Sequence, residues 1–224
     1  SLCGYPPRDL LIHGGFIQEM AIALELLAKS LPLEIAVLVG TVEVNPQAHI
    51  TGGKPLFNSA ALLFKGKIQQ VFNKRLLPTY DVFDEDRYFE AGDRSNFFTL
   101  ANSLDNASIR IGVTICEDIW NNQTFWGKRN YASDPVAELA KQEVDLLVNL
   151  SASPYAVGKP KLRESMLIHS AIAHNLPVVY ANQVGANDDL IFDGNSAAFN
   201  KQGKVIGRCS GFKSDLLILD YDID

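Results

Sequence analysis

The sequence has few cysteines, and none in a pattern that builds a disulfide framework or a metal site. Cys3, Cys116 and Cys209 are odd in number, lie far apart and include no C-x-x-C pair. Disulfide-rich domains and zinc sites both use paired cysteines, so neither class is indicated. We therefore expect no bound metal ion.

Long apolar runs and clusters of basic residues are also missing. No stretch approaches the roughly 18 consecutive apolar residues of a membrane span, and no charged and then apolar targeting segment opens the chain. Twenty-six acidic against 20 basic residues give a net charge of −6, without a run of lysines or arginines. We therefore expect a cytoplasmic protein with no nucleic-acid or membrane partner, acting on small molecules or other proteins.

The 224 residues, 47% of them hydrophobic and 21% charged, are enough for one globular domain. The chain opens at Ser1 without a methionine, and a Gly-Tyr-Pro-Pro turn follows almost at once. This start predicts a fragment whose first strand is missing.

Periodicity along the chain predicts short strands that outnumber the helices. Helices are expected over residues 16–29, over 136–143 after the cap Asp134-Pro135, and from about Pro160 to Asn175. A layered α/β sandwich with a mixed sheet fits this order better than an all-parallel sheet. The expected strands and hairpins cover residues 33–44, 59–78, 109–115, 144–153, 177–185, 196–207 and 214–222.

The end of the strand over residues 109–115 raises a chemical question. Cys116 follows this apolar run directly, and Glu117 and Asp118 come next. Neighbouring carboxylates raise the pKa of a thiol and suppress the thiolate, so a nucleophilic Cys116 needs another group to take its proton. By itself, a cysteine at the end of a buried strand is more often structural than reactive.

Candidate partners for Cys116 lie elsewhere in the sequence. Asn149, Ser151 and Ser153 follow another apolar run, and ligands in α/β sheets bind at such strand ends. Lys74 and Glu85, taken singly, are typical of surface charges. A Cys–His hydrolase is an alternative that the sequence leaves open, with His13, His49, His169 or His174 as the base.

Five ordered blocks carry a resemblance to a known family. They are GYPPRDLL, KRLLPTYDVFDEDRYFEAG, VTICEDIW, NLSASPYAVGK and ANQVGANDDLIFDGNSAAFN, and together they run over nearly the whole chain. They resemble the glutamine amidotransferase domain of glutamine-dependent NAD⁺ synthetases, a branch of the nitrilase, or carbon–nitrogen hydrolase, superfamily. The resemblance implies an α/β fold, a nitrilase-like α-β-β-α sandwich with mixed sheets, over residues 1–224.

The resemblance also implies a Glu-Lys-Cys triad that hydrolyses glutamine through a cysteine thioester. Cys116 matches the nucleophile, and Lys74 matches the lysine that stabilises the tetrahedral intermediate together with the backbone N–H of Glu117. Glu85 matches a second carboxylate that helps to place the lysine or the attacking water. The positions that match the glutamine pocket are Tyr5, Tyr80, Glu117, Trp120, Ser153 and Lys159.

One member of the triad has no counterpart in the sequence. The family's base glutamate lies six positions before the tyrosine of GYPP, and counting back six positions from Tyr5 passes Ser1. We therefore expect the 224 residues by themselves to be inactive, because nothing replaces the base. The synthetase domain of the family is expected outside this chain as well.

The implied partners and cofactors follow from this division. Glutamine is the expected substrate, and the ammonia passes to a synthetase domain of the same polypeptide, which amidates nicotinic acid adenine dinucleotide. The amide step needs no metal or cofactor, ATP and Mg²⁺ belong to the synthetase domain, and a homo-oligomer is expected. Two further interpretations stay open: a stand-alone amidase or N-carbamoyl hydrolase, and an inactive scaffold related to amidotransferases.

Overall fold

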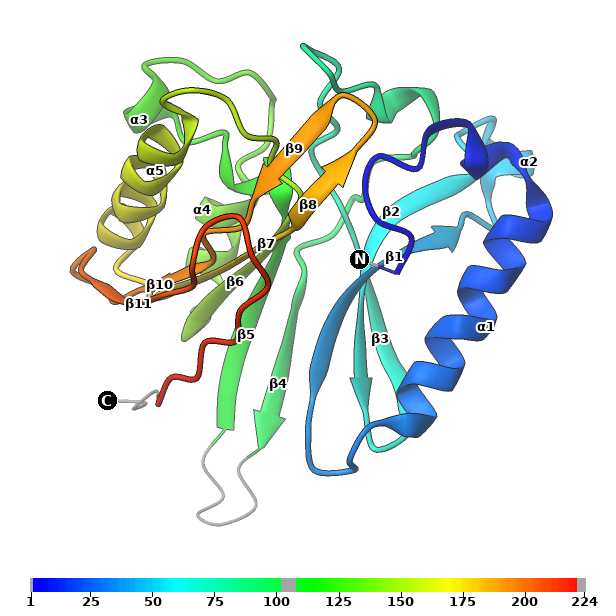
Figure 1. Ribbon diagram of the computed structural model, residues 1–224, viewed down its shortest axis with the longest axis horizontal. Helices are drawn as coiled ribbons and strands as arrows, with labels where there is room; N and C mark the ends of the chain where they lie inside the picture. Colours follow the sequence, from blue (N-terminus) through cyan, green and yellow to red (C-terminus); the bar gives the residue numbers. More distant parts are fainter. Residues whose placement is uncertain (1, 102–107, 221–224) are drawn as a thin grey trace. The chain divides into compact units, whose positions relative to one another are not determined.

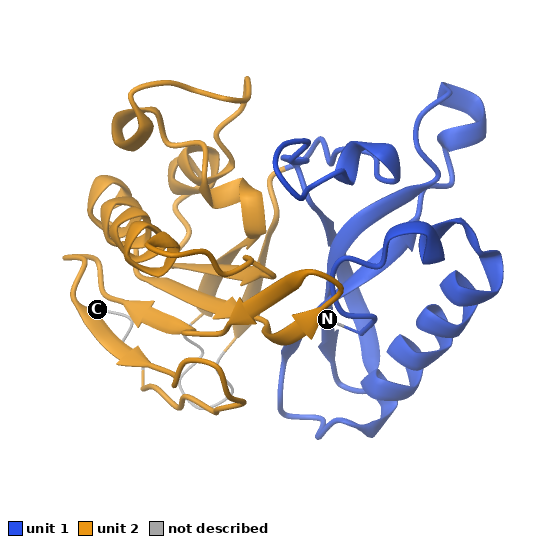
Figure 2. Ribbon diagram, turned by 45° about the horizontal axis from the view of Figure 1, so that its top comes forward, with its two compact units in different colours: residues 1–94 blue, residues 95–224 orange. Residues whose placement is uncertain are grey.

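The computed structural model describes residues 2–101 and 108–220. This described part of the chain divides into two compact units, residues 1–94 and residues 95–224, each with its own sheet and helices (Figure 2). The expected α/β class with mixed sheets is confirmed. None of the helices within the described ranges combines the length and the apolar character that a membrane crossing requires.

The first unit is built on an antiparallel sheet and one long helix. Within residues 2–94, β1 (Val37–Val44), β2 (Leu56–Phe64) and β3 (Lys67–Asn73) pair in the order β1-β2-β3. Helix α1 (Gly14–Ser30) lies along this sheet and packs its apolar stripe, including Leu24 and Ala28, against Ala61 and Leu63 (Figure 1). Short helical turns complete the unit: η1 (Arg8–Ile12), α2 (Ala48–Thr51) and η2 (Glu85–Arg87).

Strands β2 and β3 form a hairpin within residues 59–78, where the sequence predicts one, and its turn is Lys65-Gly66. Both residues have left-handed backbones, with φ of 52° and 74°. Two consecutive left-handed residues give the turn whose twist matches that of antiparallel strands. The turn, together with a register shift between Leu62 and Leu63, sets how β3 pairs with β2, and β3 leads directly to Lys74.

The second unit is built on a mixed sheet. In the described residues of this unit, the strand order is β11-β10-β7-β6-β5-β4, and β5, β6 and β7 are parallel to one another. The outer strands pair antiparallel, and β8 and β9 form a separate hairpin. The strands are β4 (Phe97–Ala101), β5 (Ser108–Ile115), β6 (Leu146–Ser151), β7 (Val178–Asn182), β8 (Val184–Asn187), β9 (Leu190–Asp193), β10 (Ala197–Phe199) and β11 (Val205–Arg208).

Helices α4 (Pro135–Lys141) and α5 (Lys159–His174) begin and end close to where the sequence predicts. The side chain of Asp134 accepts a hydrogen bond from the backbone N–H of Ala137, which caps α4, and Asn175 ends α5 with a left-handed backbone. Two shorter helices, η3 (Cys116–Ile119) and α3 (Gln123–Trp126), lie between β5 and α4 in the sequence.

One core lies between these helices and the sheet (Figure 1). Leu139 of α4 and Met166 of α5 pack with Leu147 of β6 and Val178 of β7. A side chain at Gly112 of β5 would lie 3.2 Å from Leu139, so glycine lets α4 approach the sheet closely. This packing fixes the carboxyl ends of β5, β6 and β7, where the candidate site residues of this unit lie.

The predicted last strand, residues 214–222, is wrong for residues 214–220, which form no strand; residues 221 and 222 lie outside the described residues. The alternation of apolar residues reflects one-sided packing instead. Leu217 and Leu219 lie against Gly207 of β11, while Leu216 and Ile218 are 81% and 82% exposed. An alternating pattern predicts which side chains are covered, but not whether the backbone finds a partner strand.

A buried ion pair in the second unit generates a stability prediction. Arg163 Nη2 of α5 lies 2.6 Å from Asp193 Oδ2 of β9, and their side chains are 3% and 0% exposed. Arg163→Ala leaves a buried carboxylate without its cation, so we expect the free energy of unfolding to fall by about 3–5 kcal/mol. Urea denaturation measures this loss.

The matched control is Arg208→Ala, because Arg208 pairs with Glu164 at a similar 2.7 Å while both side chains are about a third exposed. An exposed pair of this kind contributes at most about 1 kcal/mol. Equal losses for the two variants would contradict the prediction.

Candidate active site

Lys74 is fixed at the end of β3 by its backbone. Its N–H donates to the carbonyl of Asn58 at 2.8 Å, and its own carbonyl accepts from the N–H of Gly92 at 2.7 Å. The side chain is fully buried, with 0% exposed. Because a buried ammonium group is costly without a charged partner, the ordinary reading of Lys74 as a surface charge is excluded.

Glu85, the first residue of η2, is that partner. Its Oε2 lies 2.7 Å from Lys74 Nζ, and its side chain is only 5% exposed. Tyr5 donates its hydroxyl to Oε1 at 2.8 Å, and Asn58 Nδ2 lies 3.4 Å from Oε2. The carboxylate is therefore held on both oxygens and in turn holds the ammonium group, which is the geometry that a lysine-positioning role requires.

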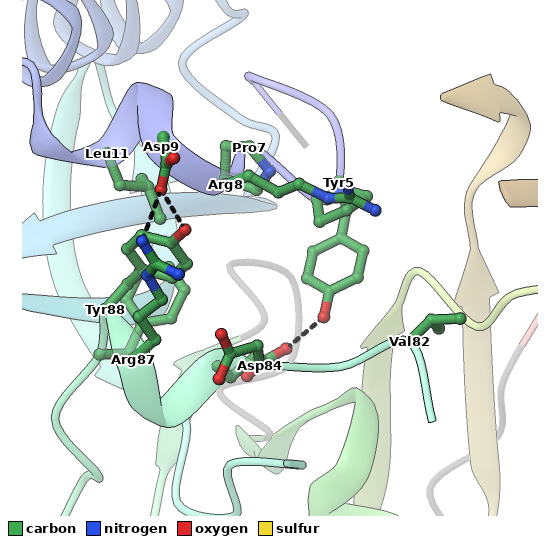
Figure 3. Close-up of a pocket in the computed structure, with 12 residues that line it drawn as sticks. Tyr5, Pro7, Arg8, Asp9, Leu11, Val82, Asp84, Arg87 and Tyr88 are labelled. Atoms are coloured by element: carbon green, nitrogen blue, oxygen red, sulfur yellow. Dashed lines mark hydrogen bonds and ion pairs between the residues drawn. The ribbon is translucent and has the colours of Figure 1, made fainter. Parts of the chain in front are cut away.

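A cavity of about 340 Å³ in the first unit opens beside this cluster. Figure 3 shows the ring of Tyr5 pointing from the N-terminal segment toward the segment that carries Asp84 and Arg87. The residue that accepts its hydrogen bond there is Glu85. On another side of the cavity, Asp9 accepts a hydrogen bond from Tyr88 at 2.5 Å and pairs with Arg87 at 3.4 Å. These contacts join the segments that line the cavity.

The structure also brings Tyr80 near Tyr5, through Phe83. The Phe83 ring centroid lies 5.5 Å from that of Tyr80 and 6.4 Å from that of Tyr5. Tyr80 is 49% exposed, so its ring offers an accessible aromatic face. Tyr5, Lys74, Tyr80 and Glu85 are thus the part of the predicted site that the first unit carries.

Cys116 belongs to the second unit and lies at a sharp turn from β5 into η3. Its φ is 46°, a left-handed conformation that is uncommon for a residue with a β-carbon. The turn is held by Asp118, which accepts from the N–H of Ile115 at 2.9 Å, and by Asn149, whose side-chain amide lies 3.4 Å from the carbonyl oxygen of Cys116. A strained strand-to-helix turn is typical of an enzyme nucleophile, because it projects the side chain beyond the end of the sheet.

Polar side chains under this turn form a connected network. Asn149 Nδ2 donates to Thr114 Oγ1 at 2.9 Å, and Ser151 Oγ donates to Asn149 Oδ1 at 2.6 Å. Thr114 and Asn149 are opposite one another in the parallel pair of β5 and β6. The polar end predicted for the β6 strand therefore supports the Cys116 turn.

Both acids that follow Cys116 have hydrogen-bond partners of their own. Asp118 is 1% exposed and holds the turn through Ile115, and Glu117 is 4% exposed and accepts from the hydroxyl of Tyr131 at 3.1 Å. Each carboxylate is therefore held in a defined orientation beside Cys116. Tyr131 was missed by the sequence reasoning, because it lies in an irregular segment outside the motif that contains Glu117.

Trp120, Lys159 and Ser153 are the other predicted site residues of the second unit. Lys159 Nζ lies 5.9 Å from the centre of the Trp120 ring, which stacks on Trp126. Ser153 is 2% exposed, and its hydroxyl lies 3.4 Å from Arg163 Nη1. The structure thus brings Trp120 and Lys159 together and connects Ser153 to the buried ion pair.

That ion pair and Tyr180 were missed by the sequence reasoning. Burial raises the pKa of the Tyr180 phenol; the cation of Arg163 opposes this shift and Cys116 adds to it. The phenol is therefore neutral at pH 7. A signal was present, since Arg163 shares the core-facing stripe of α5 with Met166 and Leu167, and a cation on such a stripe requires a buried anion.

The histidines of α5 face α3. His169 Nε2 lies 2.8 Å from Thr124 Oγ1, and His174 Nε2 lies 3.4 Å from Asn122 Nδ2. Burial lowers the pKa of His174, partly offset by Asp134. These contacts do not include Cys116, so they give no support to His169 or His174 as its base; His13 and His49 belong to the first unit.

No group of three or more His, Cys, Asp or Glu side chains is placed to hold a metal ion in the part of the chain that the structure describes.

Comparison with known proteins extends these observations. A model of the carbon-nitrogen hydrolase family matches residues 18–224. A glutamine-dependent NAD(+) synthetase of Synechocystis sp. is 53% identical over 223 residues, which are 100% of this chain and 39% of that protein. One from Thermotoga maritima is 37% identical and is covered to 35% of its length. The chain thus spans between a third and two fifths of these curated relatives.

Solved structures agree with the fold. The glutamine-dependent NAD+ synthetase from Acinetobacter baumannii, in complex with adenosine diphosphate, superposes with a TM-score of 0.78 at 37% identity over 95% of this chain and 36% of that chain. An amidase from Nesterenkonia sp. reaches 0.69 at 18% identity over 94% of this chain and 70% of that chain. The predicted nitrilase-like fold is confirmed by this likeness.

The Lys74–Glu85 pair generates a prediction for the first unit. Glu85→Leu leaves a buried ammonium group without its carboxylate, so we expect a loss of about 3–5 kcal/mol in the free energy of unfolding, and Lys74→Met is expected to cost a similar amount. The double variant should lose less than the sum, because neither charge is then left alone. Urea denaturation of all four proteins gives the coupling energy.

Arg87→Ala is the control, since its ion pair with Asp9 is more than half exposed. A coupling energy between Lys74 and Glu85 as small as that expected for such an exposed pair would show that the two side chains do not depend on each other.

Proposed function

Because the chain belongs to the carbon-nitrogen hydrolase family, we propose that it hydrolyses the side-chain amide of glutamine and supplies the ammonia to a synthetase domain of the same polypeptide. That domain amidates nicotinic acid adenine dinucleotide to NAD⁺. The observation that carries the proposal is the strained turn that presents Cys116. The similarity of the whole chain to glutamine-dependent NAD(+) synthetases supports the choice of glutamine.

In the proposed reaction, the sulfur of Cys116 attacks the carbonyl carbon of the amide. The thiol proton passes to a carboxylate base, which the resemblance assigns to the glutamate of the triad, and then to the leaving nitrogen. Ammonia leaves as the thioester forms. Water then attacks the thioester and gives a proton to the same base, which passes this proton to the departing sulfur as glutamate is released.

Lys74 and the backbone N–H of Glu117 are the proposed donors to the oxyanion. Glu85 is the proposed positioning residue for Lys74, since their 2.7 Å ion pair fixes the ammonium group and keeps it paired while no substrate is bound. This role needs a lysine that is already oriented before substrate arrives, and burial of the pair supports that.

Charge chemistry supports the proposed glutamine pocket. Free glutamine is a zwitterion, and the second unit offers a buried carboxylate at Glu117 and an ammonium group at Lys159 next to Trp120. We assign Glu117 to the substrate ammonium group and Lys159 to the substrate carboxylate. The aromatic rings of Tyr5 and Tyr80 and the hydroxyl of Ser153 complete the proposed set.

The remaining proposals concern the whole polypeptide. We propose that ATP and Mg²⁺ act outside the residues of this chain, in the synthetase domain. We also propose that the protein is a cytoplasmic homo-oligomer.

The first test separates glutamine use from ammonia use in the full-length enzyme. We expect Cys116→Ala to abolish NAD⁺ synthesis from glutamine and to leave synthesis from ammonium salts nearly unchanged, because no other group forms the thioester. Both rates are followed as NAD⁺ formed from nicotinic acid adenine dinucleotide and ATP.

Cys209→Ala, which replaces another partly buried cysteine, is the matched control and should alter neither rate. Loss of both activities in Cys116→Ala would make Cys116 a structural residue, and hydrolysis of simple amides without any NAD⁺ synthesis would favour the stand-alone amidase.

The second test concerns the oxyanion. We expect Lys74→Met to lower kcat for glutamine hydrolysis by at least about 10²-fold, since a donor of this kind contributes a few kcal/mol to the transition state. Because Lys74 is buried, the rate is measured below the unfolding temperature of the variant. Lys67→Ala, an exposed lysine of β3, is the control. A loss in Lys74→Met no larger than in Lys67→Ala would remove Lys74 from the mechanism.

A further inference from the structure

We propose that Asn121 and Tyr131 form a positioning unit for the carboxylate of Glu117, and that this unit makes the site select amides that carry a free α-ammonium group. The inference rests on the proposed function, because it concerns how the glutamine site distinguishes its substrate from simpler amides. It adds two residues that the sequence motifs do not contain.

The carboxylate of Glu117 is buried and is oriented from outside its own helix. Glu117 is 4% exposed, and its Oε1 accepts a hydrogen bond from the hydroxyl of Tyr131 at 3.1 Å. Glu117 directly follows Cys116, so the direction of this carboxylate relative to the thiol depends on a few torsion angles. A hydrogen bond that fixes those angles fixes where a substrate ammonium group must lie.

Tyr131 lies outside the helices and strands, and the side chain of Asn121 positions its backbone instead. The segment over residues 127–134 is irregular. Asn121 is 2% exposed, and its Nδ2 donates to the carbonyl oxygens of Tyr131 at 2.9 Å and Ser133 at 2.6 Å. Its Oδ1 accepts from the backbone N–H groups of Asn130 at 2.9 Å and Tyr131 at 3.2 Å.

One amide side chain therefore satisfies both backbone groups of Tyr131. This double contact fixes the backbone from which the phenol extends, much as a strand ladder would. Asn121 also follows Trp120 in sequence, so the same short segment carries the Trp120 ring and anchors the partner of Glu117. Asn121 and Tyr131 thereby connect the irregular segment to the turn that presents Cys116.

We expect Asn121 and Tyr131 to affect which substrate binds more than the rate of the chemical step. Asn121 and the Tyr131 phenol are neutral, so they orient the carboxylate of Glu117 without cancelling its charge. A buried and oriented carboxylate attracts the ammonium group of a substrate strongly, and a substrate that lacks this group gains nothing from the contact. The expected consequence is a preference for glutamine over an amide of the same length that lacks the α-amino group.

The experiment uses the full-length enzyme and two substrates, glutamine and glutaramate, which is glutamine without its α-amino group. Tyr131→Phe removes only the hydroxyl. We expect it to raise KM for glutamine by about 5–20-fold, as for a lost hydrogen bond to a charged group, with kcat changed by less than about 2-fold. The kcat/KM for glutaramate should not change. Asn121→Ala should reduce the preference for glutamine further.

Tyr88→Phe is the matched control, because it removes another phenol-to-carboxylate hydrogen bond, to Asp9 in the first unit. Its preference for glutamine should equal that of the wild type. Circular dichroism and thermal midpoints of all variants report whether the fold is intact.

The outcomes separate this inference from the proposed function. If Tyr131→Phe keeps the preference of the wild type, or loses activity equally on both substrates, the positioning role is overturned while the glutaminase function stands. If the wild type hydrolyses glutamine no better than glutaramate, the selection is overturned. If the wild type does not hydrolyse glutamine at all, the proposed function fails together with the inference.

Discussion

The buried ammonium group of Lys74 is the constraint on which the candidate site of the first unit depends. An unpaired charge at 0% exposure is not tolerated, so Glu85 must reach it, and Tyr5 and Asn58 must in turn satisfy Glu85. The N-terminal segment, β2 and η2 therefore meet at one carboxylate. Removing any of these groups leaves another of them with fewer partners, so the stability of each depends on the whole cluster.

In the second unit, the constraint is a strained turn that hydrogen bonds must stabilise. Cys116 has a left-handed backbone, and the structure around it supplies the hydrogen bonds that hold it there, through Asp118 and the network of Thr114, Asn149 and Ser151. Glu117 is likewise fixed by Tyr131. Rigid support of this kind is what an active site requires, since a nucleophile and its substrate contacts must be in place before the substrate binds.

Much of the fold was predictable because local signals are strong in this chain. The Asp134-Pro135 cap and the apolar periodicity predicted elements that the structure confirms, and the ordered motifs predicted the family. The strand expected at residues 214–222 failed within the described residues, because strand formation depends on a distant backbone partner and not on alternation alone. The roles assigned to Cys116, Lys74 and Glu85 stay predictions until they are tested.

The sequence by itself determined which residue types carry the chemistry, since the motifs around Lys74, Glu85 and Cys116 are contiguous and can be recognised without coordinates. Only the tertiary structure decided how those groups are held. Three sets of contacts join residues from 10 to 30 positions apart: the Lys74–Glu85 pair, the Arg163–Asp193 pair and the Asn121–Tyr131–Glu117 chain. Such pairings arise from burial and from the need of each buried polar group for a partner, and no local pattern encodes them.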